Sequence, residues 1–206
     1  MPLLPTPDLY QADLWAHKKI GLLGGSFNPA HEGHRHISLI AMQKLNLDAV
    51  WWMITPQNPL KSDHETQPLK ERIKSAEATA HHPHIYPTGI EAKLKTKYTS
   101  DTLPKLKSYF PKTHFVWIMG MDNLHNIHEW EKWQEIFYTM PIAVMSRPPH
   151  DDHLQSAPAT QTFKKHQIPE HKAQDLLTSP LPSWCILTHP LNHQSSTNIR
   201  QQKNDN

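Results

Sequence analysis

Short continuous runs of apolar residues alternate along the chain with stretches in which apolar residues recur every three or four positions. The continuous runs predict β-strands that are covered on both faces, as in parallel sheets. The clearest of them is AVWWMIT at 49–55. Six strands are expected in all, at 18–23, 49–55, 85–90, 114–119, 142–146 and 184–188.

The stretches with three- and four-residue spacing predict helices between these strands. One of them opens with YTSDTL, in which Thr99, Ser100 and Asp101 are helix-capping residue types and Pro104 is expected in the first turn. Strands that alternate with helices indicate the α/β class, with a doubly wound parallel sheet in a single domain. The expected helices are 34–45, 69–80, one that opens at 98–103 and reaches about 110, and 127–137.

Two stretches do not follow the alternation. Residues 1–17 contain three prolines and are expected to form an N-terminal arm on a domain of residues 18–206. Leu9, Leu14 and Trp15 are the residues that would pack this arm onto the domain. Residues 149–179 are polar and histidine-rich, which predicts a surface excursion with one short helix.

The stretch GGSFNPAHEGH at 24–34 follows the first expected strand and runs into the first helix. We expect Gly24 and Gly25 to adopt positive φ, so that the backbone N–H groups of 25–27 can approach a ligand. His31 and His34 lie three residues apart at the helix start, where imidazoles and N–H groups can face an anion. This order of elements predicts a phosphate-binding site. The alternative is a pair of surface histidines beside a structural turn.

Composition narrows the function classes. The 21 Lys and Arg residues nearly balance 19 Asp and Glu residues, which disfavours a nucleic-acid partner. No apolar run approaches the roughly 20 residues needed to cross a bilayer, so we expect a cytoplasmic protein without a membrane partner. The single cysteine, Cys185, excludes an internal disulfide and is expected to be a buried, inert thiol.

The 24–34 stretch resembles the signature of the nucleotidylyltransferase superfamily, whose core is H-x-G-H. Further motifs appear in the same order as in one branch of it, the bacterial nicotinate-nucleotide adenylyltransferases. They are NPLK at 58–61, YTSDTL at 98–103, GMDNL at 120–124 with Trp130 and Trp133, SRP at 146–148, and SSTNIR at 195–200. The resemblance spans about residues 18–200 and implies a Rossmann-like fold.

The resemblance also implies an activity: transfer of AMP from ATP to nicotinate mononucleotide, with Mg²⁺ accompanying ATP and with deamido-NAD and pyrophosphate as products. The sequence does not decide whether the protein forms a homo-oligomer. His31, His34 and Arg200 would be the catalytic residues. ATP would contact Gly24, Gly25, Ser26, Phe27, His31, His34, Asp122, Ser196, Thr197 and Arg200, and the mononucleotide would contact Asn58, Lys61, Tyr98, Thr99 and Trp130.

These residue types suit the chemistry. The attacking group is a phosphate oxygen that is already anionic, so no general base is needed and catalysis relies on alignment and charge stabilisation. Several roles have structural alternatives: Trp130 could be a platform for the pyridine ring or core packing, and Asp122 and Thr99 could be ligand contacts or helix caps.

The sequence also bears on other acceptors and on other classes of function. Nicotinamide mononucleotide is an alternative acceptor, and phosphopantetheine is disfavoured by YTSDTL and the GMDNL region. An inactive nucleotide-binding module is disfavoured by the presence of His31, His34 and Arg200. A histidine-rich metal protein would need acidic or cysteine ligands beside pairs such as His125 and His128, so we expect no metal site in the protein itself.

Overall fold

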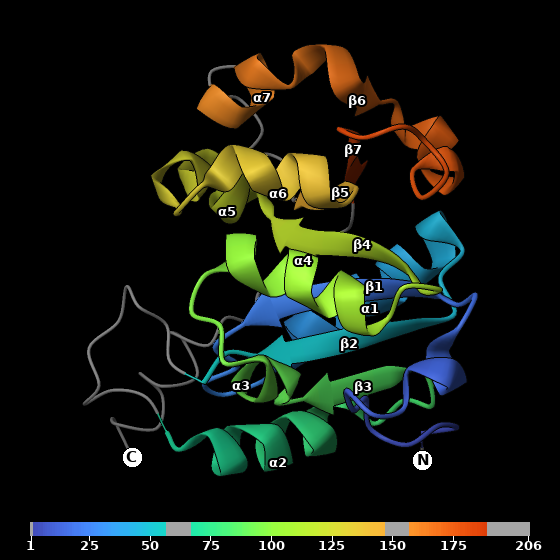
Figure 1. The fold of residues 1–206 in the computed structure, drawn as a ribbon, viewed down its shortest axis with the longest axis vertical. Coiled ribbons are helices and arrows are strands. Elements are labelled where there is room, and N and C mark those ends of the chain that lie inside the picture. Colours follow the sequence, from blue (N-terminus) through green and yellow to red (C-terminus); the bar gives the residue numbers. More distant parts are fainter. Residues whose placement is uncertain (1, 57–66, 147–156, 189–206) are drawn as a thin grey trace.

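The computed structural model describes residues 2–56, 67–146 and 157–188. Within these ranges the strands form one parallel sheet of seven strands in the order β3-β2-β1-β4-β5-β7-β6 (Figure 1). The predicted α/β class and doubly wound sheet are confirmed. The strands are β1 (Lys19–Gly25), β2 (Ala49–Ile54), β3 (Ile85–Thr88), β4 (His114–Gly120), β5 (Ile142–Ser146), β6 (Gln167–Ile168) and β7 (Trp184–Thr188).

Helices cover both faces of the sheet. One buried cluster unites α1 (Glu32–Leu45), α2 (Leu69–Ala80) and η6 (Glu170–Asp175) with one face. The other cluster covers the opposite face, with helices η1 (Ala12–Trp15), α3 (Ile90–Leu94), α4 (Thr99–Tyr109), α5 (Met121–Asn126), η3 (Ile127–Glu129), α6 (Trp133–Thr139) and α7 (Pro158–Thr162).

Strand β2 shows why its sequence is apolar throughout. Trp51 and Met53 face the cluster beneath α3 and α4, while Trp52 and Ile54 face the cluster beneath α1 and α2. All six residues of β2 are buried. An alternating polar pattern would have placed polar groups under one layer of helices, where they would lack water.

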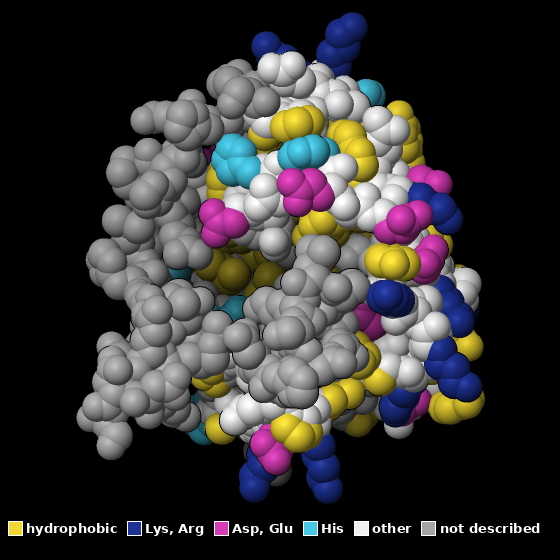
Figure 2. Space-filling view, turned by 90° about the vertical axis from the view of Figure 1, so that its left-hand side faces the viewer, with side chains coloured by type: hydrophobic (Ala, Val, Ile, Leu, Met, Phe, Trp, Pro, Cys, Tyr) yellow, Lys and Arg dark blue, Asp and Glu magenta, His cyan; other side chains and the backbone are white. Residues whose placement is uncertain are grey.

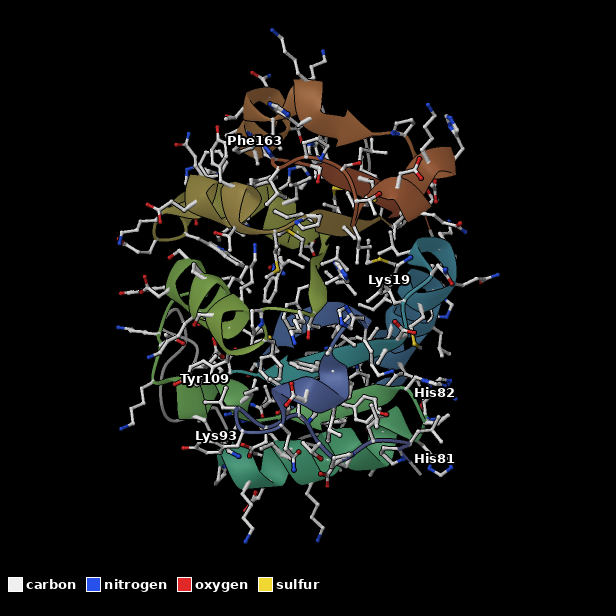
Figure 3. The ribbon with its side chains drawn as sticks, turned by 45° about the vertical axis from the view of Figure 1, so that its right-hand side comes forward. Lys19, His81, His82, Lys93, Tyr109 and Phe163 are labelled. Atoms are coloured by element: carbon white, nitrogen blue, oxygen red, sulfur yellow. The ribbon has the colours of Figure 1, made fainter. Side chains whose placement is uncertain are left out.

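The N-terminal segment lies against the β3 edge of the sheet. Trp15 is fully buried and packs edge-on against Trp51 and Tyr86, with ring centroids 4.9 Å away in both cases. Asp8 forms an ion pair with Lys93 of α3, beside the N-terminal segment in Figure 3. Leu9 packs on the core as expected, whereas Leu14 is 43% exposed and does not.

The helix expected at 127–137 is wrong. The chain instead forms α5 and η3, turns at Lys132 with φ of 48°, and starts α6 at Trp133. Ile90, expected to end a strand, begins α3. Helix α4 starts at Thr99, so Pro104 lies beyond the first turn in which it was expected.

The sequence predicts a surface excursion with one short helix for residues 149–179. The described part of this stretch contains more secondary structure than predicted. Residues 157–179 contain α7, η5 (Lys164–His166), the edge strand β6 and η6. Phe163, Ala173 and Leu176 are buried, and the Phe163 ring stacks on Phe137 with centroids 4.1 Å apart. No helix in the described ranges combines the length and apolarity that crossing a bilayer requires.

Candidate active site

The connections between strands change from one face of the sheet to the other at one point. Strand β1 connects to β2 through α1 on one face, whereas β3 connects to β4 through α3 and α4 on the other. The connections therefore diverge between β1 and β4, which pair as neighbours. In open α/β sheets ligands bind at the carboxyl ends of strands at such a point. Figure 2 faces this edge and shows hydrophobic and histidine atoms set back from the surface.

The glycines at this edge serve packing rather than unusual torsion angles. Gly24 and Gly25 belong to β1, and no glycine in the described ranges has a positive φ, so that expectation was wrong. A Cβ on Gly24 would come within 2.2 Å of the Trp117 ring. The left-handed residue is Phe27, with φ of 47°. Its ring is buried and stacks on Trp52, which compensates for the cost of that conformation.

His31 and His34 form a reciprocal cap at the start of α1. The N–H of Gly33 donates to Nδ1 of His31 at 3.1 Å, and the N–H of His31 donates to Nδ1 of His34 at 3.2 Å. The two ring centroids are 3.9 Å apart. Since each Nδ1 accepts, a neutral ring carries its proton on Nε2. A ring in this tautomer can donate a hydrogen bond to an anion, so the role of both side chains in phosphate binding stays a prediction.

A buried chain of hydrogen bonds fixes the helix turn that carries His34. Trp52 Nε1 donates to Ser38 Oγ at 2.8 Å, and Ser38 Oγ donates to the carbonyl of His34 at 2.7 Å. The Phe27 ring lies against His34 with centroids 4.6 Å apart. Strand β2, the loop after β1 and α1 are thus locked together at this histidine.

The caps considered for Asp122 and Thr99 do not occur. Gly120 is the N-cap residue of α5, and Asp122 lies exposed in the first turn. Tyr98 is the N-cap residue of α4, and Thr99 is its first helical residue. Neither helix has a side-chain cap hydrogen bond, so ligand contact remains the role to test at both positions.

The two tryptophans considered earlier differ in their surroundings. Trp133 is partly buried and packs edge-on against Phe137 and Phe163, with centroids 6.1 and 5.8 Å away. This supports its expected role in the core. Trp130 is also partly buried against the core, directly after η3. This position is compatible with both predicted roles of Trp130, which are a platform for the pyridine ring and packing in the core.

Five expected site residues lie outside the described residues. They are Asn58, Lys61, Ser196, Thr197 and Arg200. Their roles, including that of Arg200 beside the two histidines, stay predictions.

Sequence reasoning missed one residue of this edge, Arg72 on α2. It is 1% exposed, and its guanidinium donates to the carbonyl oxygens of Ser26, Thr55, Pro56 and Gln67. The signal was present in the sequence. Arg72 lies four residues before Ala76 on the apolar side of the helix, where a charged residue needs a reason.

Among the described residues, burial shifts the pKa of several ionisable groups, and it lowers that of His82. Burial also lowers the pKa of Arg72, raises that of Glu91 despite hydrogen bonds from Thr55 and Thr102, and raises the pKa of Cys185 to about 12. The Cys185 thiol is free and buried, as expected of an inert core cysteine. In the described part of the chain, no three His, Cys, Asp or Glu side chains gather as metal ligands. His128 Nδ1 instead contacts the carbonyl of His125 at 2.9 Å.

Comparison with known proteins identifies the family of the chain. Residues 22–202 match the family model described as cytidylyltransferase-like. A probable nicotinate-nucleotide adenylyltransferase of Methylorubrum extorquens is 47% identical over 182 residues, which is 88% of this chain and 98% of the relative. A protein of the same name from Rhizobium etli is 46% identical over 181 residues, which is 88% of this chain and 94% of the relative.

A solved structure shares the fold. Plasmodium falciparum nicotinic acid mononucleotide adenylyltransferase complexed with NaAD aligns with a TM-score of 0.65 at 18% identity, covering 90% of this chain and 83% of that chain. The parallel sheet and the match over residues 22–202 define the class, a nucleotidyltransferase with a Rossmann-like fold. The two relatives then identify the particular branch, and the chain belongs to the nicotinate-nucleotide adenylyltransferase family.

Proposed function

We propose that the protein transfers AMP from ATP to nicotinate mononucleotide. The observation that carries this proposal is the 47% identity to a nicotinate-nucleotide adenylyltransferase over 98% of that relative's length. The paired imidazoles at the start of α1 give the proposal a physical basis, because they offer two N–H donors at a helix N-terminus, where anions bind well.

The reaction is a displacement at phosphorus. A phosphate oxygen of the mononucleotide forms a bond to the α-phosphorus of ATP, and the bond from that phosphorus to the bridging oxygen of the β-phosphate breaks. Pyrophosphate leaves with the electron pair, and deamido-NAD is the other product. The attacking oxygen is already anionic, so no side chain has to remove a proton. The protein has to align two anions and stabilise the negative charge that grows on the leaving group.

His31 and His34 are suited to the leaving group. Their Nε2–H groups donate to triphosphate oxygens in the proposed complex, while their Nδ1 atoms are held by backbone N–H groups. Because the capping bonds fix both rings before substrate arrives, little reorganisation is needed during the reaction. One such preorganised donor lowers a barrier by about 3 kcal/mol in comparable oxyanion sites.

The remaining roles complete the proposal. The ATP phosphates lie against the backbone of Gly24, Gly25, Ser26 and Phe27, with Asp122 on a ribose and Ser196, Thr197 and Arg200 on the triphosphate. Tyr98, Thr99 and Trp130 receive the nicotinate ring, and Asn58 and Lys61 approach the mononucleotide phosphate.

ATP is proposed to bind as its Mg²⁺ complex, in which the ion neutralises phosphate charge. Mg²⁺ is commonly bound largely through substrate phosphates, so the phosphates of ATP would supply most of its ligands. A cytoplasmic location is part of the proposal, since both substrates are charged molecules that are confined to the compartment where they are made.

A pyrophosphate-release assay tests the function. The purified protein is given Mg-ATP with nicotinate mononucleotide, nicotinamide mononucleotide or phosphopantetheine. We expect turnover with the acid to exceed turnover with the amide by at least tenfold and no turnover with phosphopantetheine. Equal or greater turnover with the amide would replace the acceptor in this proposal. No pyrophosphate with any acceptor would refute the adenylyl transfer itself.

A further inference from the structure

The buried guanidinium of Arg72 donates four hydrogen bonds to backbone carbonyls at the carboxyl edge of the sheet. Its Nε donates to Gln67 O at 2.8 Å. One terminal nitrogen, Nη1, donates to Ser26 O at 2.7 Å and to Thr55 O at 2.8 Å. The other, Nη2, donates to Pro56 O at 2.7 Å. Four of the five guanidinium N–H bonds are therefore used by backbone carbonyls.

These four carbonyls belong to three different segments. Ser26 lies in the loop between β1 and α1, Thr55 and Pro56 follow β2, and Gln67 precedes α2. A further bond joins two of the segments, because Gln67 N donates to Asn28 Oδ1 at 3.3 Å. The Arg72 side chain thus sets the spacing between the proposed ATP loop and the backbone that leads to the proposed mononucleotide loop.

The charge of Arg72 has an effect as well as its shape. The partners of the Arg72 charge among the described residues are carbonyl dipoles, and none of the ion pairs in these ranges involves Arg72. A buried guanidinium in this setting keeps its proton and polarises the peptide groups that it contacts. A lysine ammonium cannot match it, because its three donors radiate from one atom instead of forming a planar fork.

One of these peptide groups, between Ser26 and Phe27, belongs to the loop of the proposed phosphate site. The Ser26–Phe27 bond is trans, since the cis bonds in the described chain are Asn28–Pro29 and Leu181–Pro182. In a trans peptide the C=O and N–H point in opposite directions. With Ser26 O held by Arg72, the Phe27 N–H points away from α2. No acceptor in the described part of the chain pairs with this N–H.

We propose that Arg72 is a positioning residue for adenylyl transfer, which orients and polarises the Ser26–Phe27 peptide toward the triphosphate and holds the backbone after β2 at the matching distance. The inference rests on the proposed function for its substrates. It assigns Arg72 no contact with either substrate. Its effect is on the alignment of the two reactants, where an error of about 1 Å can cost 100-fold in rate.

The test compares Arg72→Lys and Arg72→Met with Thr113→Val. Thr113 Oγ1 donates a buried hydrogen bond to Trp15 O at 2.9 Å before β4, at the opposite end of the strands, so this control loses stability without touching the site. For each variant, kcat and both KM values are measured below its thermal midpoint. We expect kcat to fall at least tenfold in Arg72→Lys and further in Arg72→Met, with KM values within about threefold. Thr113→Val should keep kcat within twofold.

Hydrogen–deuterium exchange adds a readout that does not need activity. We expect amides of 24–28 and 53–55 to exchange faster in Arg72→Lys and to be unchanged in Thr113→Val. Kinetics of Arg72→Lys that match those of Thr113→Val would reduce Arg72 to a packing role and overturn the proposal. So would unchanged exchange at 24–28. If the wild-type protein releases no pyrophosphate, the proposed function has failed, and exchange alone then decides whether Arg72 orients the loop. If Arg72→Met does not fold, Arg72→Lys carries the test.

Discussion

His31 and His34 each accept a capping hydrogen bond at Nδ1, and each carries a second ring nitrogen of a kind that can donate. An aspartate would cap α1 equally well through its carboxylate, but it would have no donor to offer an anion. Histidine is a side chain that accepts at one ring position and donates at another in its neutral form. The sequence motif could be predicted to bind phosphate, but the reciprocal cap that orients the rings required coordinates.

Replacing His34 by alanine tests this double use. We expect kcat/KM for nicotinate mononucleotide to fall about 100-fold or more, because a donor worth about 3 kcal/mol is lost. The lost cap should cost about 1 kcal/mol of stability, which is a shift of roughly 2–4 °C in thermal midpoint at this chain length. Steady-state kinetics and thermal melts measure both effects. The control is His128→Ala, an exposed histidine whose Nδ1 contacts the carbonyl of His125. Near-normal turnover of His34→Ala would remove His34 from the mechanism.

Alanine substitutions of Trp130 and Trp133 distinguish stacking on a ligand from packing in the core. Trp133→Ala should lower the free energy of unfolding by about 2 kcal/mol, less than a fully buried aromatic would, with the acceptor KM unchanged. Trp130→Ala should raise the KM for the mononucleotide roughly tenfold, the loss expected for one aromatic stacking contact. Urea denaturation and acceptor titration of both variants provide the measurements. Loss of stability in Trp130→Ala with an unchanged KM would place Trp130 in the core.

At the scale of elements, the sequence predicted the six longer strands because each is a continuous apolar run buried on both faces. The prediction from sequence failed where the same spacing of apolar residues is compatible with two different structures. The spacing of Trp130 and Trp133 suits one helix, but the turn at Lys132, with its φ of 48°, separates two. The two-residue strand β6 is too short for any periodicity. Its pairing with β7 depends on contacts that local sequence does not encode.

Glu170 ties three elements together and gives a pH prediction. Its carboxylate accepts hydrogen bonds from Lys44 of α1 and from the N–H and Oγ1 of Thr188, which ends β7. Partial burial alone would raise its pKa, but these bonds hold the pKa of Glu170 below its usual value. A depressed carboxyl pKa stabilises the fold above the ordinary value of 4.5, and that stability is lost as pH falls through the folded-state pKa.

Glu170→Gln keeps the shape and most acceptors but removes the charge. We expect it to be less stable than the wild-type protein at pH 7, modestly so because this ion pair is partly exposed. The difference should begin to shrink as pH falls below 4.5, where the carboxyl group of the unfolded chain becomes protonated. It should be smallest below the lower pKa of the folded state, where the wild-type carboxyl group is neutral as well. Urea denaturation of both proteins between pH 3 and 7 measures it. A difference that is constant over this range would show that the charge of Glu170 contributes nothing.

At the scale of the whole molecule, the location of the site could be predicted better than its construction. Alternating strands and helices already imply a parallel sheet with ligands at its carboxyl edge, and GGSFNPAHEGH marks which strand leads there. The hydrogen bonds from Arg72 to four backbone carbonyls could not be predicted from the sequence in this way. Arg72 reaches backbone carbonyls up to 46 positions away along the chain, and backbone carbonyls are identical in every residue type. Side-chain patterns therefore carry little trace of these hydrogen bonds beyond one arginine on an apolar helix face.

The two ends of the sheet should respond differently to nucleotide. If ATP binds where β1 and β4 end, adding Mg-ATP should slow amide exchange at 24–34 and 120–124. The connections at the opposite end, 46–48 and 110–113, should be unchanged, because they precede β2 and β4. ATP should also raise the thermal midpoint in proportion to the logarithm of its concentration once binding is saturated. Hydrogen–deuterium exchange with and without Mg-ATP measures this, with magnesium sulfate as the control for a simple anion. Protection at 110–113 and none at 24–34 would place nucleotide binding at the wrong end of the sheet and would refute the site built on His31 and His34.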